Sequence, residues 1–230
     1  DASGYKTISN EALLIYNQKV QTTFSKTSGN VTFKVQYPEN ITCGMPTTFK
    51  LSSEGTTDKV QYALYSLTTE DGTIVYDTSY GSNGKFFSKD SFDFTFYASG
   101  TYYIRFAIMD TGVSPYVWFN TGLYGIKLVI DDKGYPTVEN VVADLKAQCG
   151  KTCTTDFEKA VWFNDWLVEN CRYDSSYSYC APEGALARGS GTCEAYHRAY
   201  VMLLNSVGIA TDRISGDGHV WTGVQLDGNW

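Results

Sequence analysis

Hydrophobic and polar residues alternate along most of the chain between residues 30 and 131. The alternation has a period near two, and the segments that show it are rich in β-branched and aromatic residues, which predicts β-strands. Turn-forming sequences such as Glu70-Asp71-Gly72 and Ser99-Gly100 separate these segments. The expected strands cover residues 31–37, 47–53, 59–67, 72–78, 91–98, 100–110 and 124–132.

Seven short strands over about 100 residues are typical of an antiparallel β-sandwich of the immunoglobulin-like type. We therefore expect an all-β immunoglobulin-like domain over residues 30–132. The Cys–Trp–Cys spacing of antibody domains is absent from the sequence, so the prediction concerns the architecture only. Residues 1–29 leave two interpretations open, a helix that begins near Ser9 or an edge strand.

After Gly134 the hydrophobic period changes to that of a helix. Residues 137–148 and 154–171 are predicted to be helices, with Thr155 or Asp156 as the N-cap of the second. A third helix is expected after Cys193. The boundary is placed at residues 131–134, which gives a multidomain chain whose second, α+β domain covers residues 135–230. One buried side of the second helix is expected to contain Phe157, Ala160, Val161, Phe163, Asn164 and Leu167.

Composition and charge narrow the class of protein. Hydrophobic residues make up 43% of the chain and charged residues 19%, which is compatible with a packed core. The net charge of -7 repels phosphate, so nucleic acid is not an expected partner. No run approaches the ~18 apolar residues of a membrane helix. The chain begins at Asp1 with no recognisable signal peptide, so we expect a processed bacterial protein that is secreted or at the cell surface.

Six cysteines allow disulfide bonds in a secreted protein, but spacing alone does not give their connectivity. Cys149 with Cys153, and Cys171 with Cys180, would each close a short loop. The same four residues lack the tight pairing of a zinc site, so no metal is expected.

Cys193 has the surroundings of a reactive thiol. A thiol attacks as the thiolate, and a helix N-terminus or a nearby imidazolium favours that form. Gly189-Ser190-Gly191-Thr192 forms a turn before the third helix, so Cys193 lies at the helix N-terminus, where the dipole favours an anion. The backbone N–H of Cys193 is then free to donate to an oxyanion. The buried stripe of this helix is expected to contain Tyr196, Tyr200, Leu203, Leu204 and Val207, with Gly208 as its cap.

The chain has two histidines that can serve as a base for this thiol. His219 follows Gly216-Asp217-Gly218 and begins a strand-like run. His197 is an alternative base because it lies four residues after Cys193 on the same helix face. A buried, inert cysteine with two ordinary histidines remains the simpler interpretation at this point.

Three segments that follow one another in the sequence favour a catalytic cysteine over an inert one: "EKAVWFNDWLVENCRYD", "APEGALARGSGTCEAYHRAYVMLLNSVGI" and "ISGDGHVWTGVQLDGNW". Together they resemble the transglutaminase-like superfamily, a papain-like group of cysteine enzymes, over residues 135–230. Thr222 stands where relatives often carry Asn. The matching positions are Asn170, Tyr173 and Asp174 in the first segment, Gly191, Cys193, Tyr196, Ala199, Leu203, Leu204 and Gly208 in the second, and Gly216, His219, Trp221, Val224, Asp227, Gly228 and Trp230 in the third.

The resemblance implies a papain-like fold with Cys193 as nucleophile and His219 as base. It implies acyl transfer to water or to an amine from a protein or peptide carboxamide or peptide bond, through a thioester and without a cofactor. Tyr196 and Trp221 are candidates for the substrate cleft. Hydrolysis by a cysteine protease or amidase and cross-linking by a protein-glutamine acyltransferase both remain open, with cell-wall or surface components as further candidate partners.

The resemblance also implies a third catalytic residue, an Asp a few positions beyond Trp230. We therefore expect a domain that is incomplete at its C-terminus, and a chain much less active than one that includes this Asp. The alternative function is a non-catalytic binding or scaffold protein at the cell surface that uses the same folds.

Overall fold

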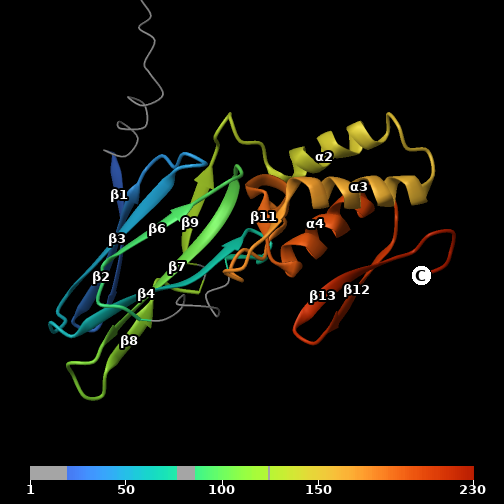
Figure 1. Cartoon of the computed structure of the whole chain (residues 1–230). Helices are drawn as coiled ribbons and strands as arrows, with labels where there is room; N and C mark the ends of the chain where they lie inside the picture. The colour runs from blue at the N-terminus through green and yellow to red at the C-terminus, as the bar shows by residue number, and fades with distance from the viewer. Residues whose placement is uncertain (1–19, 77–85, 124) are drawn as a thin grey trace, which may run out of the picture.

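The computed structural model describes residues 20–76, 86–123 and 125–230, and its N-terminal part consists of two antiparallel β-sheets (Figure 1). The first sheet has the strand order β1-β2-β3-β6. The second has the order β5-β4-β7-β8, with β9 also paired to β7. The strands are β1 (Gln21–Ser28), β2 (Val31–Pro38), β3 (Pro46–Glu54), β4 (Val60–Thr69), β5 (Ile74–Tyr76), β6 (Ser91–Thr95), β7 (Gly100–Asp110), β8 (Val117–Asn120) and β9 (Ile126–Ile130).

The two sheets share one hydrophobic core, which follows from the alternation in the sequence. In β2 the apolar residues at every second position are buried, because successive side chains of a strand point to opposite faces. Phe49 of the first sheet meets Phe106 of the second with ring centroids 5.3 Å apart. The chain therefore has extensive β-sheets in its N-terminal part, as predicted, and the immunoglobulin-like assignment stays a prediction.

Each strand expected from the sequence has a counterpart, β1 falls in the segment whose interpretation was left open, and β8 was not expected. Strand β1 lies at the edge of its sheet, so for this segment the edge-strand interpretation of residues 1–29 is confirmed. The proposed helix start at Ser9 lies outside the described residues. Residues 77–78 and 124, which belong to predicted strands, lie outside them as well.

The C-terminal part is a mixed α/β region in which three helices pack together beside a β-hairpin (Figure 1). Thr155 is the N-cap of the second helix, and its side chain and that of Glu158 form a reciprocal capping box. The elements are α2 (Val138–Cys149), α3 (Asp156–Asn170), β10 (Arg172–Tyr173), the π-helical turn η1 (Gly184–Arg188), β11 (Ser190–Gly191), α4 (Cys193–Ser206), β12 (Thr211–Gly216) and β13 (His219–Val224).

The predicted buried side of α3 is only partly correct. Ala160, Phe163 and Leu167 are buried in the helical core, but Phe157 is 63% exposed and Val161 is 41% exposed. Asn164 is also exposed. Helix α3 buries a narrow stripe at i, i+3 and i+7, and it packs against α4, α2 and η1.

A segment between β10 and η1 joins the two parts of the molecule. Tyr179 stacks on Phe94 of the sandwich with ring centroids 5.7 Å apart, and Ala181 belongs to the sandwich core. Glu183, which is almost completely buried, accepts a hydrogen bond from the backbone N–H of Tyr97 at 3.0 Å. Side chains of the C-terminal part thus complete the core of the N-terminal part.

The structure contains no disulfide bond among its described residues, so neither of the two closures considered from the sequence is formed in it. Within the described ranges, every helix is too short or too polar to cross a membrane.

Candidate active site

Cys193 is the first residue of α4, as the sequence predicts. The side chain of the N-cap Thr192 accepts a hydrogen bond from the N–H of Ala195, which starts the helix at this cysteine. The glycines before it have two different roles. Gly189 takes a positive φ of 70°, but Gly191 does not; instead, a Cβ at Gly191 would lie 2.5 Å from the Cβ of Ala195. The chain therefore needs Gly191 for close packing, and only Gly189 for its conformation.

His219 is the first residue of β13 and follows a tight turn. Asp217 and Gly218 have positive φ values of 51° and 72°, as in the hairpin turns that match the twist of two strands. Gly216 pairs with His219 across this turn. The imidazole is exposed and meets the ring of Trp221 edge-on, with centroids 4.8 Å apart.

Cys193 and His219 together line two neighbouring cavities. The first, here named the aromatic cavity, has a volume of about 400 Å³ and is also lined by Tyr196, Tyr200 and Trp221. The second, here named the arginine cavity, has a volume of about 1150 Å³ and is also lined by Arg198 and Arg213. The cysteine and the histidine, 26 positions apart in the sequence, thus border the same space on both sides.

Residues 143–230 match the model of the transglutaminase-like superfamily. This part of the chain is similar to that superfamily. Searches of curated proteins and of solved structures gave no match. The family match covers α3, α4 and the β12–β13 hairpin, so it contains both residues that border the two cavities.

Within the transglutaminase-like domain, Tyr173 lies near the candidate nucleophile. Strand β10 pairs in parallel with β11, which places Tyr173 opposite Gly191, two residues before Cys193. Tyr173 lines both cavities together with Cys193. Burial, followed by the neighbouring side chain of Cys193, raises the pKa of Tyr173, although the backbone of Cys193 opposes this shift. The sequence matched Tyr173 to a family motif but gave it no role, because its contact depends on the β10–β11 pairing.

His197, the alternative base, lies in a different setting. Its side chain is buried, and its Nδ1 lies 2.8 Å from the hydroxyl of Thr222 on β13. Burial lowers the pKa of His197, so the neutral form is favoured. The ring lines the aromatic cavity but not the arginine cavity.

The two cleft candidates from the sequence, Tyr196 and Trp221, both line the aromatic cavity. The hydroxyl of Tyr196 donates to the backbone carbonyl of Cys171, so this side chain presents its ring rather than its hydroxyl. Trp221 is about half exposed, and its side chain makes no hydrogen bond in the described structure.

An ionic cluster borders the cysteine on its other side. The carboxylate of Glu194 accepts two hydrogen bonds from Arg213, at 2.8 and 2.7 Å, and one from Nε of Arg198 at 2.6 Å. Its partners outweigh its partial burial, so the pKa of Glu194 is lowered. The sequence contained these three charges, but nothing in their spacing showed that β12 brings Arg213 to α4.

Asp174 stabilises the loop after β10 rather than the candidate reaction site. It is buried, accepts hydrogen bonds from Ser176 and Tyr179, and lies 3.6 Å from Arg188. These partners together lower the pKa of Asp174 although burial opposes them. Asp174, which matches the family motif, therefore has a structural role in this loop.

Proposed function

We propose that this protein is a cysteine acyltransferase or amide hydrolase in which Cys193 is the nucleophile and His219 is the general base. The observation that carries the proposal is that both residues, which belong to the transglutaminase-like domain, border the same two cavities. The position of Cys193 at the N-terminus of α4 supports it, because the helix dipole favours a thiolate there.

In the proposed reaction, His219 takes the thiol proton and the sulfur of Cys193 attacks the carbonyl carbon of a carboxamide or peptide bond. The carbonyl π electrons move to oxygen and form a tetrahedral oxyanion. When the intermediate collapses, the C–N bond breaks, the nitrogen takes a proton from the imidazolium, and a thioester remains on Cys193. Water or an amine then attacks the thioester with the histidine again acting as base, which returns the free thiol.

Tyr173 is the side chain best placed to help with the oxyanion. Tyr173 lines both cavities beside Cys193, and the side chain and the backbone of Cys193 both affect the pKa of its hydroxyl. Because Tyr173 is 48% exposed, its ring has room to shift when a substrate carbonyl enters. We assign the N–H of Cys193 and the hydroxyl of Tyr173 as the two donors to the developing negative charge.

The first experiment measures the reactivity of the thiol. At about pH 6, a thiolate paired with an imidazolium reacts quickly with iodoacetamide, whereas an ordinary thiol does not. Peptide mapping of the alkylated protein should find Cys193 modified first among the six cysteines. Slow, uniform alkylation would favour the non-catalytic scaffold function instead.

A pair of histidine variants identifies the base. His219→Gln is expected to reduce the alkylation rate of Cys193 at about pH 6 by tenfold or more, because the thiolate loses its partner. His197→Gln is the matched control and should leave this rate within about twofold. The opposite result, a loss in the His197 variant alone, would assign the base to His197. Release of ammonia from glutamine-containing peptides then tests the acyl-transfer step.

A further inference from the structure

The arginine cavity lies between the transglutaminase-like domain and the sandwich, and it opens directly onto Cys193. Ile74 of β5 forms part of its wall, so the sandwich contributes to the surroundings of the candidate nucleophile. A cavity of about 1150 Å³ has the size of a small-molecule or peptide side-chain site. Its position next to the sulfur suits the part of a substrate that flanks the reacting carbonyl.

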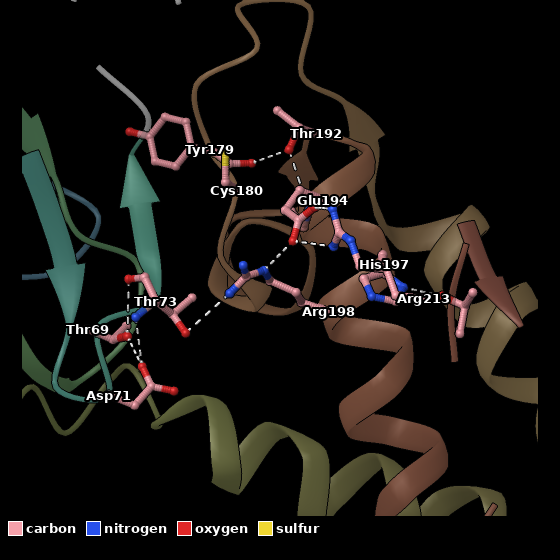
Figure 2. A network of polar contacts seen from close by, with 12 residues as sticks. Thr69, Asp71, Thr73, Tyr179, Cys180, Thr192, Glu194, His197, Arg198 and Arg213 are labelled. Carbon is pink, nitrogen blue, oxygen red and sulfur yellow. Dashed lines mark hydrogen bonds and ion pairs between the residues drawn. The ribbon is translucent and has the colours of Figure 1, made fainter. Parts of the chain in front are cut away.

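The ionic groups in this wall carry a net positive charge. Glu194 contributes one negative charge, and Arg198 and Arg213 contribute two positive charges. Figure 2 shows Glu194 between the two arginines. Glu194 lies deepest, with a side chain 19% exposed, while those of Arg198 and Arg213 are 37% and 49% exposed. The positive groups are therefore the ones that face the solvent in the cavity.

Each guanidinium retains donors after these contacts. A guanidinium has five N–H donors. In the described structure Arg213 uses two of them on Glu194, and Arg198 uses one on Glu194 and one on the hydroxyl of Thr73 (Figure 2). The remaining donors suit a planar carboxylate.

The two arginines differ in how much of their charge is offset. Asp71, next to Thr73 in the sandwich, accepts hydrogen bonds from Thr69 and Thr73. These hydrogen bonds lower the pKa of Asp71, and the charge of Arg198 adds a smaller effect in the same direction. Arg213 has Glu194 as its ion-pair partner and also lies close enough to Cys193 to interact with a charge on the sulfur. Of the two arginines, Arg213 thus has the less compensated positive charge, and it lies beside the nucleophile.

We propose that the arginine cavity is a carboxylate-binding subsite, in which Arg213 selects peptide acyl donors that carry an acidic side chain next to the reacting carbonyl. This inference rests on the proposed function, because it assigns a substrate class to that same site. The sandwich takes part in the selection through Thr73, which holds Arg198, and through Ile74.

The test compares two reagents of nearly equal size at the same sulfur. Iodoacetate carries a carboxylate and iodoacetamide does not, and both react with the thiolate, so the ratio of their rates at Cys193 cancels the thiolate fraction. At low ionic strength Arg213→Gln is expected to lower the iodoacetate-to-iodoacetamide ratio about three- to tenfold, and added salt should reduce the difference. Arg213→Lys keeps the charge and should keep most of the ratio.

Lys146→Gln is the matched control, since it removes one positive charge from an exposed position on α2. Its ratio should equal that of the unmodified protein. An equal ratio in the unmodified protein and in Arg213→Gln would overturn the carboxylate subsite while leaving the nucleophile assignment intact. A Cys193 inert to both reagents would overturn the proposed function, and the subsite with it.

Peptides provide a second measurement. Glutamine-containing pentapeptides with a single Glu at each of the other positions are compared with the same peptides carrying Gln or Lys there. Ammonia release should be at least about fivefold faster, in kcat/KM, for the best Glu position, and this preference should disappear in Arg213→Gln. A preference that persists in this variant would place acidic recognition elsewhere.

Discussion

Glu183 gives the sharpest test of how the two parts of the chain are joined. Its Oε1 accepts the N–H of Tyr97, and its Oε2 lies 2.7 Å from the hydroxyl of Tyr102. That hydroxyl also lies 2.9 Å from the carbonyl oxygen of Ala98. A tyrosine hydroxyl has a single hydrogen and can donate to only one of these two acceptors. A protonated Glu183 supplies the second hydrogen, and burial raises the pKa of Glu183 in agreement with this arrangement.

Two substitutions distinguish a neutral carboxyl group from a carboxylate. In Glu183→Gln the amide oxygen accepts from Tyr97 and the amide nitrogen donates to the Tyr102 hydroxyl, so the free energy of unfolding should stay within about 1 kcal/mol of the original at pH 5. Glu183→Ala removes both contacts and leaves a cavity, which should cost about 2–4 kcal/mol.

The pH dependence has a definite sign. Because the pKa of Glu183 is raised above its ordinary value of 4.5, the folded state binds the proton more tightly than the unfolded state does. The stability that this provides is complete below the unfolded pKa and is lost as pH rises towards the folded pKa, by about 1.4 kcal/mol per unit of difference. Glu183→Gln has no such loss, so its advantage over the original should grow as pH increases above 4.5.

Urea unfolding followed by tryptophan fluorescence and circular dichroism at pH 5 and pH 8 measures these differences. Glu169→Gln, at an exposed position on α3, is the matched control and should change the unfolding free energy by less than about 0.5 kcal/mol at both pH values. If Glu183→Gln destabilised the protein as much as Glu183→Ala at both pH values, the neutral-acid arrangement would be wrong.

Four further predictions concern single residues. Tyr173→Phe should lower kcat for ammonia release by about 10- to 100-fold with little change in KM, because it removes an oxyanion donor; an unchanged kcat would contradict this role. Thr222→Val should lower the unfolding free energy by about 1–2 kcal/mol, measured by urea titration, because the buried Nδ1 of His197 loses its partner. Since burial lowers the pKa of His197, its contribution is present above its unfolded pKa of 6.5 and is lost on acidification, so His197→Gln should show a flatter stability curve below pH 6.5. Thr155→Ala should lower the melting temperature through the loss of about 1 kcal/mol of capping energy, and an unchanged melting temperature would exclude this role.

The β-strands were predictable where alternation was strong, as in β2 and β7. Strand β1 was not, because its sequence, QTTFSKTS, is mostly polar on both faces and lies at a sheet edge. On α3, the apolar residues Phe157 and Val161 fitted the helical period but lie outside the stripe that meets α4. The hydrophobic period of a sequence shows which residues can share one face of a helix, whereas their burial depends on the element that packs against that face.

For the candidate site, the order of three motifs predicted Cys193 and His219 as a pair, and both line the same two cavities. Their partners could not be predicted in the same way. Tyr173 reaches the cysteine through a two-residue parallel pairing, and Arg213 reaches Glu194 across two elements. Both contacts depend on tertiary placement that no local spacing encodes.

The carbonyl of Tyr179 has a consequence for any attempt to recombine this protein. It accepts hydrogen bonds from the N–H and the hydroxyl of Thr192, at 3.0 and 3.1 Å, while the Tyr179 ring packs on Phe94 of the sandwich. Figure 2 shows Tyr179 and Thr192 side by side. A chimaera that carries a foreign β-sandwich would therefore loosen the first turn of the helix that presents Cys193, even with every residue of the family match retained. Through Tyr179, the sandwich helps to position the helix turn that carries the thiol. The two parts would therefore have to be exchanged together.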